Sequence, residues 1–106
     1  MRLAELYATL HAAIFSELKT GQDIPLIRRN LQREYVTRVA IVLLRPAVTM
    51  PADARALLRA DAVQLRDELA AMRRKPKASA ETRAHVAESL AVLDDALKAA
   101  SVRQGS

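Results

Sequence analysis

Apolar side chains recur at intervals of three and four residues in four stretches of this chain, and this period restricts the fold more than any other feature. The interval matches the 3.6-residue turn of an α-helix and does not match the alternation of a half-buried strand. The four stretches cover residues 2–19, 24–44, 52–74 and 80–101. The sequence therefore predicts an all-α protein built from amphipathic helices.

Residues that end or begin helices separate the four stretches. Gly21 can adopt the left-handed geometry that closes a helix, and Asp23 stands before Pro25 as a carboxylate cap before a first-turn proline. Two prolines stiffen residues 45–51, and Ser79 is a natural cap for the last helix. The predicted breaks are residues 20–23, 45–51 and 75–79.

Connectors of about 4–8 residues between long helices favour neighbours that run in opposite directions. We therefore predict a four-helix, predominantly antiparallel bundle that forms a single domain over residues 1–102. Residues 103–106 contain no large apolar side chain and are expected to form a disordered tail.

One face of each predicted helix should be buried. Phe15 lies off the main stripe of the first helix, and we expect it to be exposed or to contact another chain. The expected buried stripes are Leu3, Leu6, Tyr7, Leu10, Ile14 and Leu18; Ile27, Leu31, Tyr35, Val39 and Val42; Leu58, Ala62, Leu65, Leu69 and Met72; and Val86, Leu90, Leu93, Leu97 and Ala100.

The sequence offers little material for catalysis. It has no cysteine and only two histidines, His11 and His85, which lie in different predicted helices without the HExxH spacing of zinc peptidases. Asp94 with Asp95 and Asp61 with Glu68 are the nearest approach to paired carboxylates, and we expect all four on solvated faces. We predict no catalytic residue, no metal site and no cofactor for this chain.

The formal net charge of +5 is concentrated between residues 24 and 77. Arg28, Arg29, Gln32 and Arg33 should share one solvent-facing side of the second helix, where guanidinium groups could grip carboxylates or phosphates. We interpret these four residues as a protein-contact surface. Nucleic-acid binding and a merely solvated face are the alternatives, although no stacking aromatics or reading motif accompanies the arginines.

No apolar stretch approaches the roughly 20 residues of a membrane span. The first 18 residues carry two glutamates in an amphipathic pattern and lack the continuous apolar core of a signal peptide. We expect no membrane span, and the residues alone leave the compartment unknown.

Several segments resemble the C-terminal helical region of bacterial zinc-dependent metalloproteases of the met-zincin group. The similarity is strongest over residues 14–36, in IFSELKTG followed by RRNLQREY, and it is looser in DARAL and in TRAHV with ESL. The extended HExxH motif and the methionine turn on which that family's catalysis depends are absent, so the resemblance assigns no catalytic residue here.

The resemblance implies that this chain is a non-catalytic structural or interaction domain, with zinc held elsewhere in a parent peptidase. Its partner would be the rest of that peptidase or a sister subunit, and a homodimer is a further possibility. The resemblance also suggests a secreted or periplasmic location. The alternative function is a free-standing basic helical module that binds nucleic acid.

Overall fold

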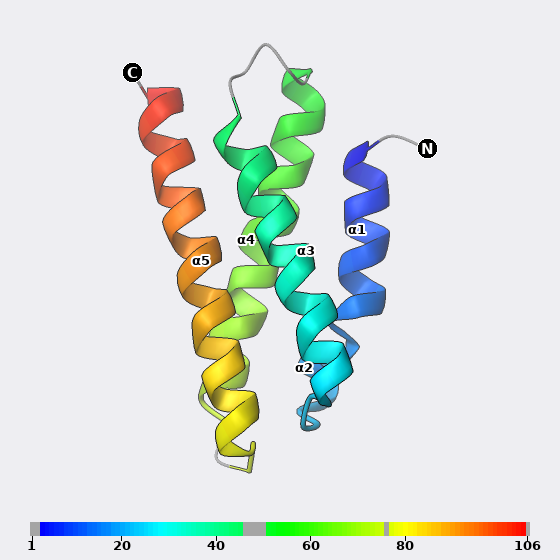
Figure 1. The fold of residues 1–106 in the computed structure, drawn as a ribbon. Coiled ribbons are helices and arrows are strands. Elements are labelled where there is room, and N and C mark those ends of the chain that lie inside the picture. Colours follow the sequence, from blue (N-terminus) through cyan, green and yellow to red (C-terminus); the bar gives the residue numbers. More distant parts are fainter. Residues whose placement is uncertain (1–2, 46–50, 76, 106) are drawn as a thin grey trace.

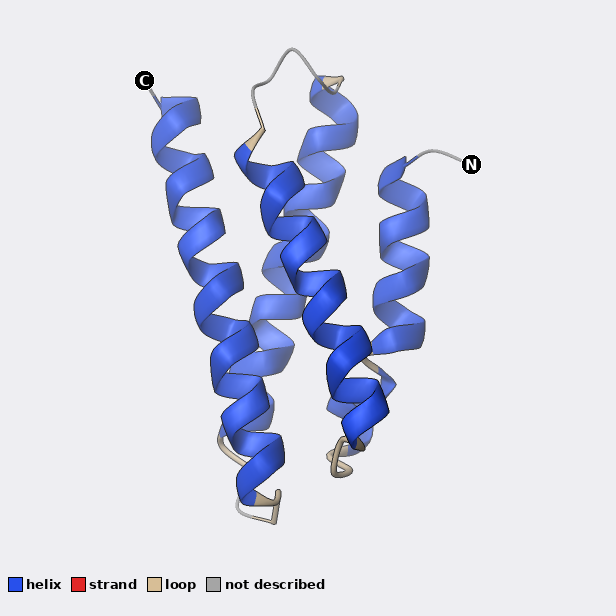
Figure 2. Ribbon diagram, viewed as in Figure 1, coloured by secondary structure: helices blue, strands red, loops and turns tan. Residues whose placement is uncertain are grey.

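The structure is a computed structural model that describes residues 3–45, 51–75 and 77–105. Within these ranges it contains five helices and no strand (Figure 2). The helices are α1 (Leu3–Ile14), α2 (Ser16–Thr20), α3 (Leu26–Leu44), α4 (Ala52–Arg73) and α5 (Ala80–Gly105). The prediction of an all-α chain is confirmed. None of the described helices is long and apolar enough to cross a membrane.

The four longer helices lie side by side and reverse direction from one to the next along the chain (Figure 1). In this view α3 lies in front of α4, with α5 on one side and α1 on the other. All five helices contribute buried side chains to one continuous apolar core. One side of α3 therefore faces the core and the other faces away from it.

The two C-terminal helices bury the faces that their periodicity predicts. In α4 the five predicted residues, from Leu58 to Met72, are all at most 2% exposed. In α5 four of the five predicted residues are buried, and Leu90 is partly buried against the core. In both helices the large apolar residues spaced three and four apart form the buried face, so the sequence pattern was sufficient to orient them.

The prediction of one continuous first helix was wrong, because the helix breaks at Phe15. There the amide of Leu18 donates to the Phe15 carbonyl at 3.1 Å, three residues back, and leaves the Ile14 carbonyl outside the helical ladder. The break turns Phe15 into the core at 2% exposure, contrary to the expected exposed position. Its ring packs edge-on against Tyr35 and His11, with centroids 5.5 and 5.9 Å away.

The buried faces predicted for the first two helices were partly wrong. Leu6 is 42% exposed, and in α3 the side chains of Ile27 and Leu31 are 79% and 43% exposed. The core side of α3 instead contains Gln32, Tyr35, Val36, Val39, Ala40 and Leu43. Apolar residues occur on two sides of this helix, so periodicity alone could not show which side faces inward.

The helix ends are only partly as predicted. Gly21 closes α2 with φ of 70°, and the Ser79 hydroxyl accepts the Thr82 amide at 3.2 Å as an N-cap does. The expected Asp23 cap on the second helix was wrong: α3 begins after Pro25, and Asp23 accepts the amide of Ser79 at 2.8 Å. This hydrogen bond ties the α2–α3 loop to the start of α5.

Two predictions concern the C-terminal residues and the proline connectors. The helix α5 continues to Gly105, past its predicted end at 101 and into the stretch 103–106 that we expected to be disordered. Residues 46–50, Pro76 and Ser106 lie outside the described residues, and so do the parts of the two predicted proline connectors that fall on them.

Candidate functional site

Arg28, the first of the predicted contact residues, reaches from α3 to the break between α1 and α2. Its Nε lies 2.9 Å from a carboxylate oxygen of Glu17, which is buried, and one terminal nitrogen donates to the carbonyls of Ala13 and Ile14, both at 2.9 Å. The hydrogen bond to Glu17 raises the pKa of Arg28. The guanidinium therefore satisfies carbonyls near the helix break.

Gln32 was predicted to face solvent, and this was wrong, since its side chain is completely buried. Its amide nitrogen donates to the Ile14 carbonyl at 2.8 Å, and its amide oxygen lies 2.8 Å from Nε2 of His85 on α5. A buried polar group requires such partners. The two hydrogen bonds of the Gln32 side chain thus connect α3 to both α1 and α5.

His85 is neutral in this network. Burial lowers its pKa, and the positive charges of Arg33 and Arg29 lower it further. A neutral ring that donates from Nε2 to Gln32 leaves Nδ1 as an acceptor, and this atom has no hydrogen-bond partner among the described residues.

Arg29 and Arg33 are placed differently from Arg28 and Gln32. Nε of Arg29 is buried without a hydrogen-bond partner in the described part of the chain, while Nε of Arg33 lies 3.5 Å from Glu88 on α5, with both side chains more than half exposed. The four predicted residues therefore do not form one shared exposed surface. Their role in binding another protein stays a prediction.

A second polar cluster joins α1 to α4 around His11. Nδ1 of His11 lies 2.9 Å from Asp61, and Nε2 lies 2.5 Å from Glu68. The histidine side chain is 7% exposed, and the two carboxylates are 14% and 21% exposed. The expectation that Asp61 and Glu68 lie on a solvated face was wrong.

Because ionised carboxylates only accept hydrogen bonds, the geometry fits a His11 ring that carries a proton on each nitrogen. Burial by itself lowers its pKa, but the hydrogen bonds and negative charges of Asp61 and Glu68 outweigh this effect and raise the pKa above its ordinary value. A small hollow of about 210 Å³ opens beside the cluster. With both ring nitrogens bonded, we interpret the cluster as a charged clamp between the helices.

The sequence contains one indication of this clamp, the spacing of Asp61 and Glu68, although the clamp itself was not predicted. Asp61 and Glu68 are seven residues apart, which places them on one side of a helix, two turns from each other. Only the docking of α1, 50 residues earlier in the chain than Asp61, brings a histidine between them.

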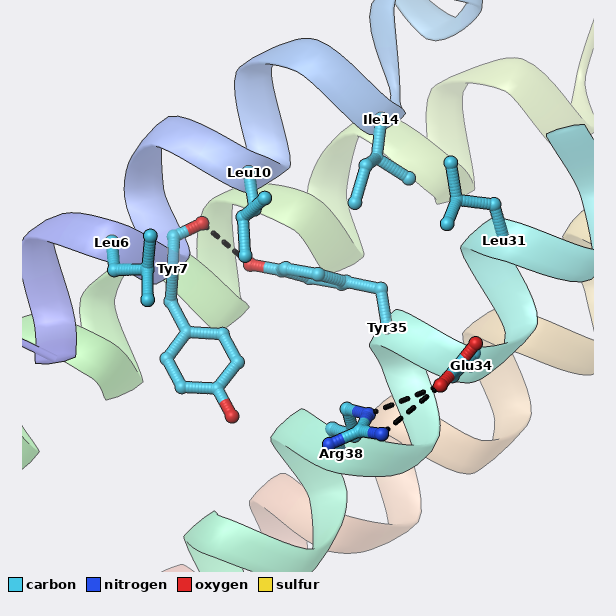
Figure 3. Close-up of a pocket in the computed structure, with 8 residues that line it drawn as sticks. All are labelled: Leu6, Tyr7, Leu10, Ile14, Leu31, Glu34, Tyr35 and Arg38. Carbon is cyan, nitrogen blue, oxygen red and sulfur yellow. Dashed lines mark hydrogen bonds and ion pairs between the residues drawn. The ribbon is translucent and has the colours of Figure 1, made fainter.

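The most exposed apolar region lies on the outer side of α3 and the adjoining part of α1. A groove of about 360 Å³ runs between these helices, lined by Leu6, Tyr7, Leu10, Ile14, Leu31, Glu34, Tyr35 and Arg38 (Figure 3). The Tyr35 hydroxyl donates to the Tyr7 carbonyl at 2.9 Å across its floor. Arg38 and Glu34 form an ion pair of 3.1 Å at its rim.

We define the outer seam of α3 as the residues that point away from the core along this helix: Ile27, Leu31, Glu34, Arg38 and Ile41. Its three apolar members are 43–79% exposed, and its two charged side chains are 60% and 67% exposed. Exposed apolar side chains gathered at a groove are a typical feature of protein-binding sites.

No set of three or more His, Cys, Asp or Glu side chains within residues 3–45, 51–75 and 77–105 is arranged to hold a metal ion. Comparison with known proteins adds no identity: no protein-family model, no curated protein and no solved structure matches this chain.

Proposed function

We propose that this chain is a non-catalytic helical interaction domain, an antiparallel four-helix bundle that binds another protein through the outer seam of α3 and the adjoining groove. The observation that carries the proposal is the exposure of Ile27, Leu31 and Ile41 on one side of a helix whose opposite side is buried. Fully burying a side chain of this size is worth about 1.5–3 kcal/mol. Covering the seam would therefore contribute several kcal/mol to association.

The polar networks support a structural role for the remaining residues. Arg28, Gln32, His11 and His85 are the groups with the chemistry to act on a ligand, and each is hydrogen-bonded between helices. These bonds hold α1, α2 and α5 around α3 and α4. The outer seam makes no such hydrogen bond between helices in the described part of the chain, so it remains as the candidate binding surface.

The proposed partner is the zinc-binding part of a met-zincin peptidase, to which the chain would belong as a terminal domain or sister subunit. This choice rests on the resemblance over residues 14–36. In that arrangement the peptidase part would supply the zinc ligands and the catalysis, and this chain would supply an apolar docking surface.

Nucleic-acid binding is the competing proposal, and it is supported by the arginines at positions 28, 29 and 33 of α3. Arg28, the first of them, forms an ion pair with Glu17 within the chain. Phosphate binding would show a steep loss of affinity with salt, because each contact releases counterions. Protein docking through apolar side chains would change little between low and moderate salt.

The first test is the gene: an HExxH-containing reading frame in the same or an adjacent coding sequence is expected. The isotope-labelled chain is then titrated with that zinc-binding part and followed by NMR. We expect amide shifts concentrated on α1 and α3, and their loss in Leu31→Glu. Val92→Glu is the matched control, because Val92 on α5 is 41% exposed and Leu31 is 43% exposed.

Absence of any such reading frame would remove the peptidase as partner. Shifts confined to α4 and α5, or binding unchanged by Leu31→Glu, would contradict docking through the outer seam.

A further inference from the structure

The outer seam of α3 has the spacing of a coiled-coil interface. Its members stand at positions 27, 31, 34, 38 and 41, so the intervals alternate between four and three residues. This is the a/d pattern of a heptad, which keeps one stripe of a helix facing a second helix. None of the described helices covers this stripe, since Ile27, Leu31 and Ile41 are 79%, 43% and 51% exposed.

Four of the five seam residues, Leu31, Glu34, Arg38 and Ile41, are arranged symmetrically about the midpoint between Glu34 and Arg38, and Ile27 lies outside this symmetric part. Glu34 and Arg38 lie on either side of the midpoint, and Leu31 and Ile41 lie one step further out in each direction. An antiparallel copy centred on that midpoint places Glu34 against Arg38 and Leu31 against Ile41, twice over. A parallel copy would instead place Glu34 on Glu34 and Arg38 on Arg38.

The shape of the surface fits the same arrangement. Glu34 and Arg38 line the groove toward α1. With Asn30, Arg33, Thr37 and Ile41 they also border an open space of about 540 Å³ over the exposed face of α3. Side chains on the surface of one helix form ridges that pack into the grooves of a neighbouring helix, so this open face can receive a second helix.

We infer that the partner of the outer seam is a second copy of this chain, bound as a two-fold symmetric dimer with the two α3 helices antiparallel. The inference rests on the docking surface of the proposed function, and it assigns that surface to a second copy of the chain in place of the peptidase part. The Glu34–Arg38 pairs would contribute register more than affinity, as polar residues in a heptad seam do, and the apolar residues on either side would supply the burial.

The absence of cysteine from the chain makes a direct test possible. Leu31→Cys and Ile41→Cys are prepared separately, and disulfide formation is measured for each alone and for their mixture. The antiparallel dimer predicts rapid cross-linking in the mixture only. Val92→Cys, alone or mixed with either variant, is the control and should not cross-link rapidly.

Sedimentation equilibrium of the cysteine-free chain gives the dimer constant independently. Arg38→Glu and Glu34→Arg should each weaken the homodimer about tenfold or more, because like charges then face each other. The double variant Glu34→Arg/Arg38→Glu should restore it. Circular dichroism of each variant should show unchanged helix content, so that weakening reports association and not unfolding.

The outcomes separate this inference from the proposed function. A chain that stays monomeric but binds the peptidase part through Leu31 would overturn the dimer and keep the docking surface. Rapid cross-linking of Leu31→Cys with itself would overturn the antiparallel arrangement. A monomeric chain whose NMR spectrum is unmoved by the peptidase part would overturn both.

Discussion

Replacing His11 by alanine removes the charged clamp between α1 and α4 and tests how much this clamp stabilises the fold. The substitution removes the imidazolium that donates to both Asp61 and Glu68, so two partly buried carboxylates lose their shared positive charge. Removing one partner of a fully buried ion pair costs about 3–5 kcal/mol. Because the two carboxylates keep 14% and 21% exposure, we expect a loss of about 2–3 kcal/mol.

The loss is large against the total stability of a small domain, which is about 5–15 kcal/mol. For a chain of this length each kcal/mol shifts the Tm by about 4–8 °C, so the variant should melt about 10–20 °C lower. Urea unfolding followed by circular dichroism at pH 6 measures the free energy directly. A cavity beside Phe15 would also destabilise the variant, so the electrostatic part needs its own control.

A double-mutant cycle provides that control. In the background Asp61→Asn/Glu68→Gln, which keeps the shape and removes the charge, His11→Ala should cost much less than in the native chain. An equal cost in both backgrounds would refute the clamp and leave only packing.

The pH dependence gives a second check on the same group. The pKa of His11 is raised in the folded state, so its contribution is complete below the unfolded value of about 6.5 and is lost as the pH rises through the folded value. The stability gap between the native chain and His11→Ala should therefore narrow between pH 6 and pH 9.5. A gap that widens with pH would refute the reasoning.

Three further predictions concern other parts of the structure. The pKa of His85 is lowered in the folded state, so its contribution to stability is complete above about pH 6.5 and is lost as the pH falls. The difference in unfolding free energy between the native chain and His85→Ala, measured by urea unfolding, should therefore widen from pH 5 to pH 7.5. Gln32→Leu should lower the free energy of unfolding by about 1–3 kcal/mol in the same assay, because it leaves Nε2 of the buried His85 unpaired. The control Arg33→Gln, at a side chain that is more than half exposed, should change it by less than about 0.5 kcal/mol. Gly21→Ala should cost about 1 kcal/mol, seen as a lower Tm, since its φ of 70° disfavours a side chain; no loss would contradict the left-handed cap.

The outer seam of α3 shows which part of a helix's packing can be predicted from sequence and which part cannot. The predicted stripe placed Ile27 and Leu31 with Tyr35, Val39 and Val42 on one buried side of α3, and this was only partly right. The structure buries Tyr35 and Val39 and leaves Ile27 and Leu31 exposed, because apolar residues occur on more than one side of this helix. A polar side chain such as that of Gln32 is buried only where it finds hydrogen-bond partners, and its partners, Ile14 and His85, are distant in sequence.

By itself the sequence determined the helical class, the approximate helix limits and the buried faces of α4 and α5. These depend on local properties, namely a 3.6-residue period, a single apolar stripe and capping residues such as Gly21 and Ser79. Tertiary structure alone decided that Phe15 breaks the first helix, that His11 sits between Asp61 and Glu68, and that the outer seam of α3 faces away from the core. Each of these depends on contacts between residues far apart in the chain, because which side of a helix is buried is set by the helices that pack against it.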